Sequence, residues 1–218
     1  MKKQTIIALA LLILLTTITF QQKIEISKFN IKRINIENNS ILNEKDIKKL
    51  LTPIYEKNLI LLNSSEIEKA LMQSSYIDSY KIKKKYPETL NIKIFEKKPI
   101  AILVNKNQKF YLSEKIDLIK FKNLTNYQNL PYVIGNKDKF KIFYNNLKKI
   151  NFPLNLVKKY ILYDSDRWDL ETIDQKLIKL PSQNYMKSIE NYLNLKEDNN
   201  FKKYKVFDYR INKQLILK

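Results

Sequence analysis

Four carboxylates fall within a short stretch of the chain: Asp164, Asp166, Asp169 and Glu171. Paired carboxylates act as general acid and base, or hold a metal ion, when they converge in a cleft. Asp164 and Asp166 would share one face of a strand, because side chains two residues apart point the same way. Exposed charges around a solvated strand give the same pattern, so the cluster predicts a charged surface and no catalytic pair.

The chain has no His, no Cys and one Gly, and these counts exclude most catalytic and cofactor chemistry. Without His or Cys there is no zinc finger, no Ser-His or Cys-His nucleophile and no disulfide. One glycine cannot form a glycine-rich phosphate loop or a dinucleotide fingerprint. We therefore expect no enzyme activity, no metal, no cofactor and no small-molecule substrate.

A Ser-Lys dyad is the nucleophile that a chain without His retains. The serines concerned are expected at helix starts or turns, where serine caps backbone N–H groups; they are Ser64, Ser65, Ser113 and Ser182. A membrane-anchored Ser-Lys hydrolase therefore stays only as an alternative interpretation.

The net charge of +19 has the sign of a nucleic-acid binder. Of the 41 basic residues only Arg33, Arg167 and Arg210 are arginines, and specific base contacts rely on the forked guanidinium. Abundant Lys, Ile, Asn and Tyr beside scarce Gly and Arg indicate a compositional drift along the whole chain. We interpret the charge as a solvated Lys-rich surface and expect no nucleic-acid partner.

An apolar run from Thr5 to Phe20 follows Lys2 and Lys3. Its sixteen residues span about 24 Å as a helix, and flanking glutamines extend it toward a hydrocarbon core of ~30 Å. The run lacks the Ala-x-Ala site of a cleaved signal peptide, the competing interpretation. We predict a cytoplasmic tail over 1–4, a transmembrane helix over 5–22 and a linker over 23–28. The anchor residues are Ile6, Leu9, Leu12, Leu15 and Phe20.

The orientation of this helix follows from the lysines before it, which favour a cytoplasmic N-terminus. Basic residues also follow the run, from Lys23 to Arg33, but long domains translocate largely regardless of charge. We expect a single-pass protein of the inner membrane with the bulk of the chain periplasmic.

Residues 29–97 form the first readable unit. A strand is predicted over 29–37, with a bulge where its alternation changes phase. Leu42–Ile47 and Leu62–Ile67 both show a staple, an Asn cap and an acidic third position, which indicate two helix starts. Strands over 77–83 and 89–96 follow, the second with Leu90, Ile92 and Ile94 inward. The order is strand, helix, helix, strand, strand.

Residues beyond 99 read as a second, sheet-rich α+β unit. Strands are predicted over 100–104, 110–112, 132–134, 160–163, 167–170, 177–180, 206–209 and 215–217, with helices over 139–150 and from Tyr185 to Leu193. Trp168 is predicted to fill the core of this unit. Its neighbours Arg167 and Asp169 face away from it.

Two segments of the first unit carry a resemblance to a known family: Lys84–Ile94, with Pro87-Glu88-Thr89-Leu90, and Glu96–Ala101, with Glu96-Lys97-Lys98-Pro99. They resemble the "Pro-acidic-Thr-Leu" strand and "Glu-basic-x-Pro" exit of the POTRA domain in FtsQ/DivIB cell-division proteins. Asn58–Leu62 is similar to that family's stretch between the two helices.

Three further matches lie in the second unit. Arg167–Leu170 and Leu177–Pro181 resemble the paired strands of the family's β domain, and Asp208-Tyr209-Arg210 resembles its terminal "Asp-x-Arg" strand. The family often has Gly after the first POTRA strand and in the turn after the Arg-Trp-Asp strand. This chain has Asn38-Asn39 and Asp174-Gln175 there.

The resemblance implies an α+β fold with an N-terminal transmembrane helix, a POTRA domain over 29–98 and an FtsQ-like β domain over 99–218. It implies a divisome scaffold, concentrated at the division site, that links small bitopic coiled-coil proteins of the FtsB/FtsL kind with other divisome members and helps control septal peptidoglycan synthesis. The alternative is a POTRA adaptor in secretion or outer-membrane assembly. An exposed terminal strand can accept a partner strand, and the expected partner-binding residues are Tyr209, Ile211, Leu215, Ile216 and Leu217.

Overall fold

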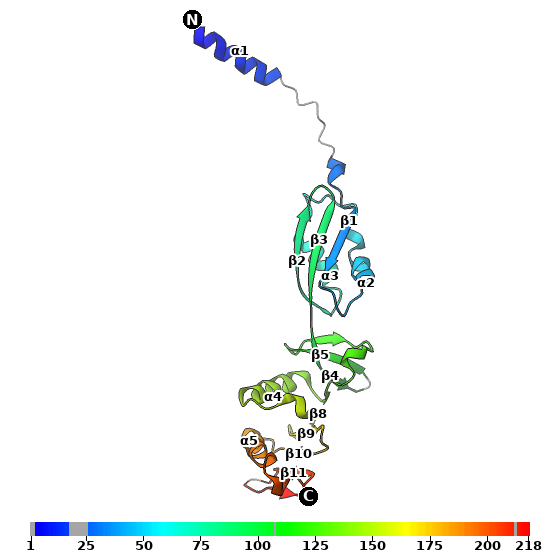
Figure 1. Ribbon diagram of the computed structural model, residues 1–218, viewed down its shortest axis with the longest axis vertical. Helices are drawn as coiled ribbons and strands as arrows, with labels where there is room; N and C mark the ends of the chain where they lie inside the picture. The colour runs from blue at the N-terminus through cyan, green and yellow to red at the C-terminus, as the bar shows by residue number, and fades with distance from the viewer. Residues whose placement is uncertain (1–2, 18–25, 107, 212) are drawn as a thin grey trace. The chain divides into compact units, whose positions relative to one another are not determined.

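The computed structural model describes residues 3–17, 26–106, 108–211 and 213–218 (Figure 1). The chain folds into two compact units. The first comprises Met1–Asn38, Asn43–Leu71 and Lys81–Lys93, and the second comprises Asn39–Leu42, Met72–Tyr80 and Ile94–Lys218. The limits 29–98 and 99–218 for the two domains stay a prediction.

The N-terminal helix α1 (Lys3–Thr17) is apolar on every side. Its exposed side chains include Ile6, Leu9, Leu12 and Leu15, which are 53% to 70% accessible. Over the stretches that the structure describes, no helix reaches the length and apolar character needed to cross a bilayer. Residues 18–22 of the predicted span, with Phe20, lie outside those stretches. The membrane anchor therefore stays a prediction.

The part of the chain from Ile26 to Glu96 contains the predicted order of strand, two helices and two strands, and its last two strands cross the boundary between the units. Its elements are η1 (Ile26–Phe29), β1 (Arg33–Glu37), α2 (Glu44–Leu50), η2 (Thr52–Ile54), α3 (Ser64–Leu71), β2 (Ile77–Lys85) and β3 (Thr89–Glu96). The sheet order is β1-β3-β2, with β1 parallel to β3. Leu90, Ile92 and Ile94 are fully buried, so the alternation predicted for the last strand is confirmed.

Local details of this unit differ from the prediction. The strand expected over 29–37 begins only at Arg33, because Phe29 ends a 3-10 turn. Asn63 caps α3 by accepting a hydrogen bond from the Ser65 N–H at 3.0 Å. Asn43 occupies the same position before α2, but its side chain makes no cap bond.

The acidic residues of the two POTRA-like motifs both hold loops. The Glu96 carboxylate accepts hydrogen bonds from Ser40, Ile41 and Leu42, with the backbone N–H groups at 2.7 to 2.8 Å. The Glu88 carboxylate pairs with Lys32 at 3.1 Å and Arg33 at 3.0 Å. Glu88 therefore ties the start of β1 to the turn before β3, and Glu96 ties the loop after β1 to the end of β3.

The second unit is built on a nine-stranded sheet of order β12-β11-β10-β9-β8-β7-β4-β5-β6. The strands are β4 (Pro99–Asn105), β5 (Gln108–Ser113), β6 (Leu118–Lys120), β7 (Tyr132–Ile134), β8 (Val157–Leu162), β9 (Trp168–Thr172), β10 (Leu177–Lys179), β11 (Val206–Asp208) and β12 (Ile216–Leu217). The helical elements are η3 (Thr125–Tyr127), α4 (Lys137–Lys149), η4 (Leu154–Leu156), α5 (Tyr185–Lys196) and η5 (Asn199–Phe201). All strands of this sheet except β6 were predicted from the sequence.

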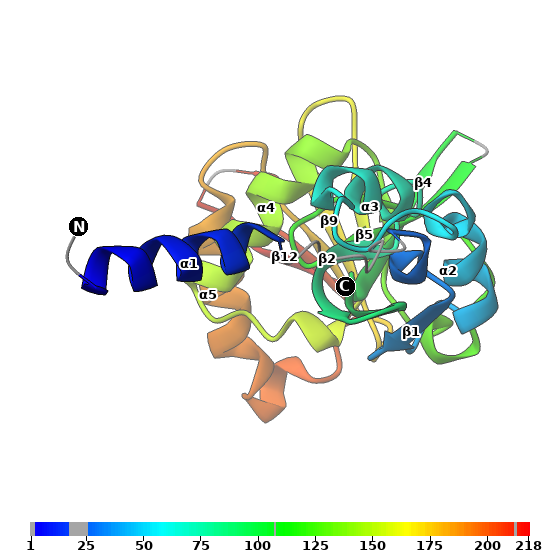
Figure 2. The same ribbon diagram turned by 90° about the horizontal axis from the view of Figure 1, so that it is seen from above.

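Helices α4 and α5 lie on one side of this sheet, as Figure 1 and the view from above in Figure 2 both show. Their inward side chains join an aromatic core. Trp168 is 5% exposed and stacks on Phe143 with ring centroids 4.8 Å apart. The prediction that Trp168 fills the core is confirmed.

Left-handed backbone is common in this glycine-poor chain. Nine described residues other than Gly have positive φ. They include Asn38 (φ 66) and Gln175 (φ 62), at the two sites where the resembling family often has Gly. Gly135 combines φ +143 with close packing, since a Cβ there would lie 2.6 Å from the Leu162 Cβ. Asn and Gln can replace Gly where a positive φ is the only requirement. At Gly135 the Leu162 side chain also leaves no room for a Cβ.

Candidate functional site

Two carboxylates of β9 and the turn before it are each engaged by a lysine. Asp166 forms an ion pair with Lys139, and Glu171 accepts a hydrogen bond from Lys159 at 2.7 Å. That hydrogen bond lowers the pKa of Glu171 below its usual value. Among the described residues, no three His, Cys, Asp or Glu side chains gather as a metal site would need. The Asp166 and Glu171 carboxylates therefore belong to separate ion pairs.

The serines likewise have structural positions. Ser64 and Ser65 begin α3, and the Ser113 hydroxyl accepts a hydrogen bond from the Asp117 N–H at 3.0 Å, which closes a turn. Ser182 borders a cavity. A Ser-Lys hydrolase finds no support in this arrangement.

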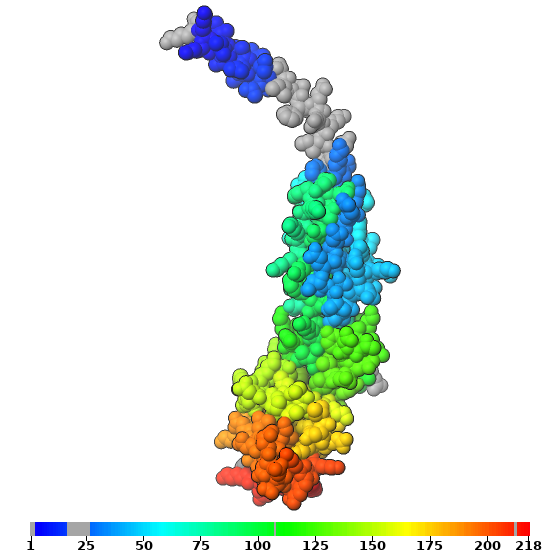
Figure 3. Space-filling model, viewed as in Figure 1, coloured from blue at the N-terminus to red at the C-terminus, as the bar shows by residue number. Residues whose placement is uncertain are grey.

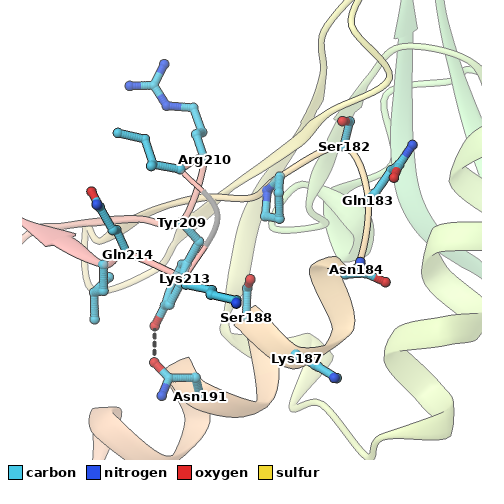
Figure 4. Close-up of a pocket in the computed structure, with 13 residues that line it drawn as sticks. Ser182, Gln183, Asn184, Lys187, Ser188, Asn191, Tyr209, Arg210, Lys213 and Gln214 are labelled. Carbon is cyan, nitrogen blue, oxygen red and sulfur yellow. Dashed lines mark hydrogen bonds between the residues drawn. The ribbon is translucent and has the colours of Figure 1, made fainter.

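The cavity that Ser182 borders is a cleft of about 670 Å³ beside the end of the nine-stranded sheet. It lies between the loop 181–184, the first turns of α5 and residues 209–211 and 213–215 (Figure 4). Three cations line it, Lys187, Arg210 and Lys213, and no carboxylate is among its lining side chains. The cleft is therefore suited to a segment that carries acidic groups.

The strand β12 forms the edge of the sheet next to this cleft. Lys218 and Val206 exchange two backbone hydrogen bonds, at 2.9 and 3.1 Å. The next pair inward, Leu217 and Phe207, is then a non-hydrogen-bonded pair, because the two kinds alternate in antiparallel ladders. The Leu217 N–H and C=O consequently point to the outer side of the sheet, where another strand can pair with them.

Charged residues cross the sheet in a row behind this edge. The register sets Asp169 opposite Lys179 and Lys179 opposite Asp208. Arg210 binds the Asp208 carboxylate through its Nε and Nη2, with the shortest contact at 2.6 Å. These hydrogen bonds lower the pKa of Asp208 and raise that of Arg210. They hold the Arg210 side chain at the rim of the cleft in Figure 4.

Asp169 is the buried member of the row. Its side chain is 1% exposed and accepts a hydrogen bond from Arg167 Nε at 3.2 Å. Burial raises the pKa of Asp169, while the positive charge and hydrogen bond of Arg167 oppose that rise. Arg167 also lies over the Tyr163 ring at 4.3 Å, so the Arg167–Asp169 pair is part of the fold.

The five residues predicted to bind a partner are placed in two groups. Tyr209 is buried and donates a hydrogen bond to Asn191 Oδ1 at 3.0 Å, and Leu215 and Leu217 pack against the core. Ile211 and Ile216 are 51% and 37% exposed. Tyr209, Leu215 and Leu217 thus face inward together, whereas Ile211 lies in a bend outside the strand. Whether these residues bind a partner stays a prediction.

The wall of the cleft formed by α5 and the loop before it was not predicted from the sequence. Lys187, Ser188 and Asn191 come from α5, and Pro181 and Gln183 come from the loop before it. The available signal was the polar face of the 185–196 helix, opposite its buried Ile189 and Tyr192. The surface formed by α5 and the last strands is the orange to red end of Figure 3.

Comparison with known proteins finds similarity both for the N-terminal part and for most of the chain. Residues 29–97 match the family described as "POTRA domain, FtsQ-type". The chain is 29% identical to the cell division protein FtsQ of Rickettsia bellii over 164 residues, which are 74% of this chain and 61% of that protein. It is 27% identical to the FtsQ of Rickettsia conorii over 200 residues, 90% of this chain and 74% of that one.

A solved structure is also similar to part of the chain. It is the major extracytoplasmic domain of the cell division protein DivIB from Geobacillus stearothermophilus, at 16% identity and a TM-score of 0.33. The match covers 45% of this chain and 89% of that one. A TM-score this low carries no argument about the fold.

Proposed function

From the premise that the chain belongs to the FtsQ/DivIB family, we propose that it is a non-enzymatic scaffold of the bacterial division machinery. It is held in the inner membrane by a single helix, with its folded units in the periplasm. It binds small bitopic coiled-coil division proteins of the FtsB/FtsL kind and other divisome members. Through these contacts it helps control septal peptidoglycan synthesis.

The observation that carries this proposal is the free outer edge of β12 beside a cleft lined by cations. A partner strand that pairs with Leu217 gains backbone hydrogen bonds, which give affinity without regard to sequence. Arg210 and Lys213 then select a partner whose chain carries Asp or Glu next to the paired strand. The partner is therefore expected to bring both an extended segment and acidic side chains.

The membrane attachment is supported by helix α1. Its side chains from Ile6 to Leu15 are apolar and exposed all around the helix. A soluble helix normally keeps a polar face toward water. A helix without such a face gains most when lipid surrounds it.

The test replaces the outward N–H of Leu217 without disturbing the ladder to β11. Proline is tolerated where a strand N–H faces away from its neighbour, so Leu217→Pro keeps the β11–β12 pairing. We expect it to weaken binding of a purified FtsB-like partner from the same host at least tenfold. Leu217→Ala, which keeps the N–H, is the matched control and should weaken binding much less.

A fluorescent fusion of the full chain in dividing cells tests the role itself. The scaffold proposal expects a band at the constriction site, weaker in Leu217→Pro than in Leu217→Ala. A uniform membrane signal through division would contradict the division role. Equal partner binding by the two variants would contradict the β12 edge as the docking site while leaving the division role intact.

A further inference from the structure

The turn between α2 and α3 presents two large apolar side chains to solvent. Leu59 and Leu62 are buried at 0% and 7% exposure, whereas Ile60 and Leu61 between them are 51% and 77% exposed. Tyr86, in the β2–β3 turn, is 56% exposed. We call Ile60, Leu61 and Tyr86 the Leu61 tip. All three belong to the first unit.

Polar side chains hold the tip in this form. Asn58 Oδ1 accepts hydrogen bonds from the Ile60 N–H at 2.9 Å and the Leu61 N–H at 3.3 Å. Lys84 Nζ donates to the carbonyl oxygens of Ile60 at 3.2 Å and Leu62 at 3.0 Å. The turn is therefore built to keep the two apolar side chains outside the core.

The tip lies where the chain arrives from helix α1. The Leu59 N–H donates to the Phe29 carbonyl at 2.7 Å, and the Phe29 ring meets the Tyr86 ring edge-on at 6.3 Å. Phe29 ends η1, and Figure 1 draws η1 and the β2–β3 turn at the same end of the first unit. From Thr17 to Ile26 the backbone can span at most about 32 Å, so the tip is tethered close to the apolar helix.

Basic residues outnumber acidic ones in the segments next to the tip. The segments 26–33, 56–62 and 84–88 contain six basic residues, Lys28, Lys32, Arg33, Lys57, Lys84 and Lys85, and two acidic ones, Glu56 and Glu88. Three of the cations are in ion pairs, Lys32 and Arg33 with Glu88 and Lys57 with Glu66. Exposed aliphatic side chains and a tyrosine, with lysines in the neighbouring segments, suit the boundary between the headgroups and acyl chains of an anionic bilayer.

We propose that the Leu61 tip is a second membrane contact, which inserts Ile60 and Leu61 into the interface of an anionic phospholipid bilayer. This contact rests on the proposed membrane attachment, because α1 keeps the tip near lipid. A protein partner fits the tip less well, because only two aliphatic side chains project from residues 59–62 and these residues offer no open strand edge. The contact fixes which end of the first unit faces the membrane.

The test uses the absence of cysteine from the chain. Full-length Leu61→Cys is labelled with an environment-sensitive fluorophore and reconstituted into phosphatidylethanolamine–phosphatidylglycerol vesicles that contain lipids with a quencher near the headgroup. The matched control is Ile173→Cys, an aliphatic residue of similar exposure, 60%, in the second unit. Leu9→Cys reports the anchor in the same vesicles.

We expect quenching of the Leu61 label severalfold above that of the Ile173 label. Neutralising Lys85 by Lys85→Gln should lower the ratio of membrane-bound to unbound tip about fivefold. Lys69→Gln, at the far end of α3, should leave this ratio unchanged.

Equal quenching at Leu61 and Ile173, with strong quenching at Leu9, would contradict insertion of the tip and leave the proposed anchor intact. An unquenched Leu9 label would overturn the anchor. Protection of the Leu61 label from aqueous iodide without lipid quenching would assign the tip to a protein or a second copy and would also overturn the proposal.

Discussion

The Leu61 tip and the β12 edge expose opposite parts of the polypeptide. The tip exposes apolar side chains while its backbone groups are bonded to Asn58 and Lys84. The β12 edge exposes backbone groups while Leu215 and Leu217 turn inward. Exposed apolar side chains whose backbone groups are already hydrogen-bonded suit a fluid surface, which offers no directional hydrogen-bond partner. Unpaired backbone N–H and C=O groups suit an ordered partner strand. The two proposed contacts therefore use different parts of the polypeptide.

The cores beneath these surfaces differ as well. The buried hydrophobic residues of β1, α2 and α3 are aliphatic, such as Ile34, Ile47 and Ile67. The core of the second unit is rich in rings, and Phe207 and Tyr192 meet edge-on at 5.0 Å directly behind β12. The position of the β12 edge therefore depends on large aromatic side chains, while the tip depends on hydrogen bonds within a turn.

The largest effect is expected from Phe207→Ala. This side chain is fully buried, and truncation of a buried Phe lowers the free energy of unfolding by about 3–5 kcal/mol. The denaturant midpoint of the full chain, followed by Trp168 fluorescence, measures the loss. Binding of the FtsB-like partner should fall with it, while lipid quenching at Leu61 should persist. Loss of both partner binding and lipid quenching at Leu61 in this variant would contradict the independence of the two surfaces.

A smaller, pH-dependent effect is expected from Asp208→Asn. Hydrogen bonds from Arg210 lower the pKa of Asp208. A lowered carboxyl pKa stabilises the folded state above the unfolded pKa of about 3.9, and this stabilisation is lost as the pH falls through the folded pKa. We expect a loss of about 1–2 kcal/mol at pH 7 that shrinks below about pH 4.

Asp169→Asn is the matched control for that experiment, because burial raises the pKa of Asp169. A raised carboxyl pKa disfavours the folded state as the pH rises through it. The free energy of unfolding of Asp169→Asn, relative to the unsubstituted chain, should therefore improve with rising pH. Denaturant titrations between pH 3 and pH 7 separate the two signs. A loss in Asp208→Asn that does not change with pH would contradict the role of the Arg210 pair.

A gain in stability is expected from Gln175→Gly. Gln175 is exposed and has φ 62 in the turn between β9 and β10. Glycine relieves left-handed strain of about 1–2 kcal/mol but adds entropy to the unfolded chain, so we expect a net gain of about 0.5–1 kcal/mol in the free energy of unfolding. Gln175→Val should be destabilising, because a β-branched residue fits this backbone poorly. Thermal melts of both variants measure the difference.

The smallest effect is expected from Leu61→Ser. Its side chain touches little of the fold, and surface substitutions usually change stability by less than about 0.5 kcal/mol. The neighbouring Leu59→Ala should lower the free energy of unfolding by about 2–5 kcal/mol, since Leu59 is fully buried. Urea titration of the two variants compares them directly. A large loss in Leu61→Ser would show that the tip belongs to the core.

Period-two alternation made the strands predictable where one face is buried, as in Thr89–Glu96. Cap residues located α3 through Asn63 but predicted a side-chain bond at Asn43 that does not form, because local sequence cannot specify the final orientation of a side chain. The strand β6 escaped prediction because Leu118–Lys120 has only one buried residue. The edge position of β12 was predicted correctly, but the cleft depends on α5 returning beside Tyr209, which is a tertiary contact.

Gly135 shows how far the composition of this protein can drift. Eight of the nine described left-handed residues other than Gly are exposed, so their side chains meet solvent, and Ile116 is the buried exception. At Gly135 the Leu162 side chain occupies the space that any Cβ would need. The scarcity of glycine in this chain therefore stops at a position where a steric requirement is added to the positive φ.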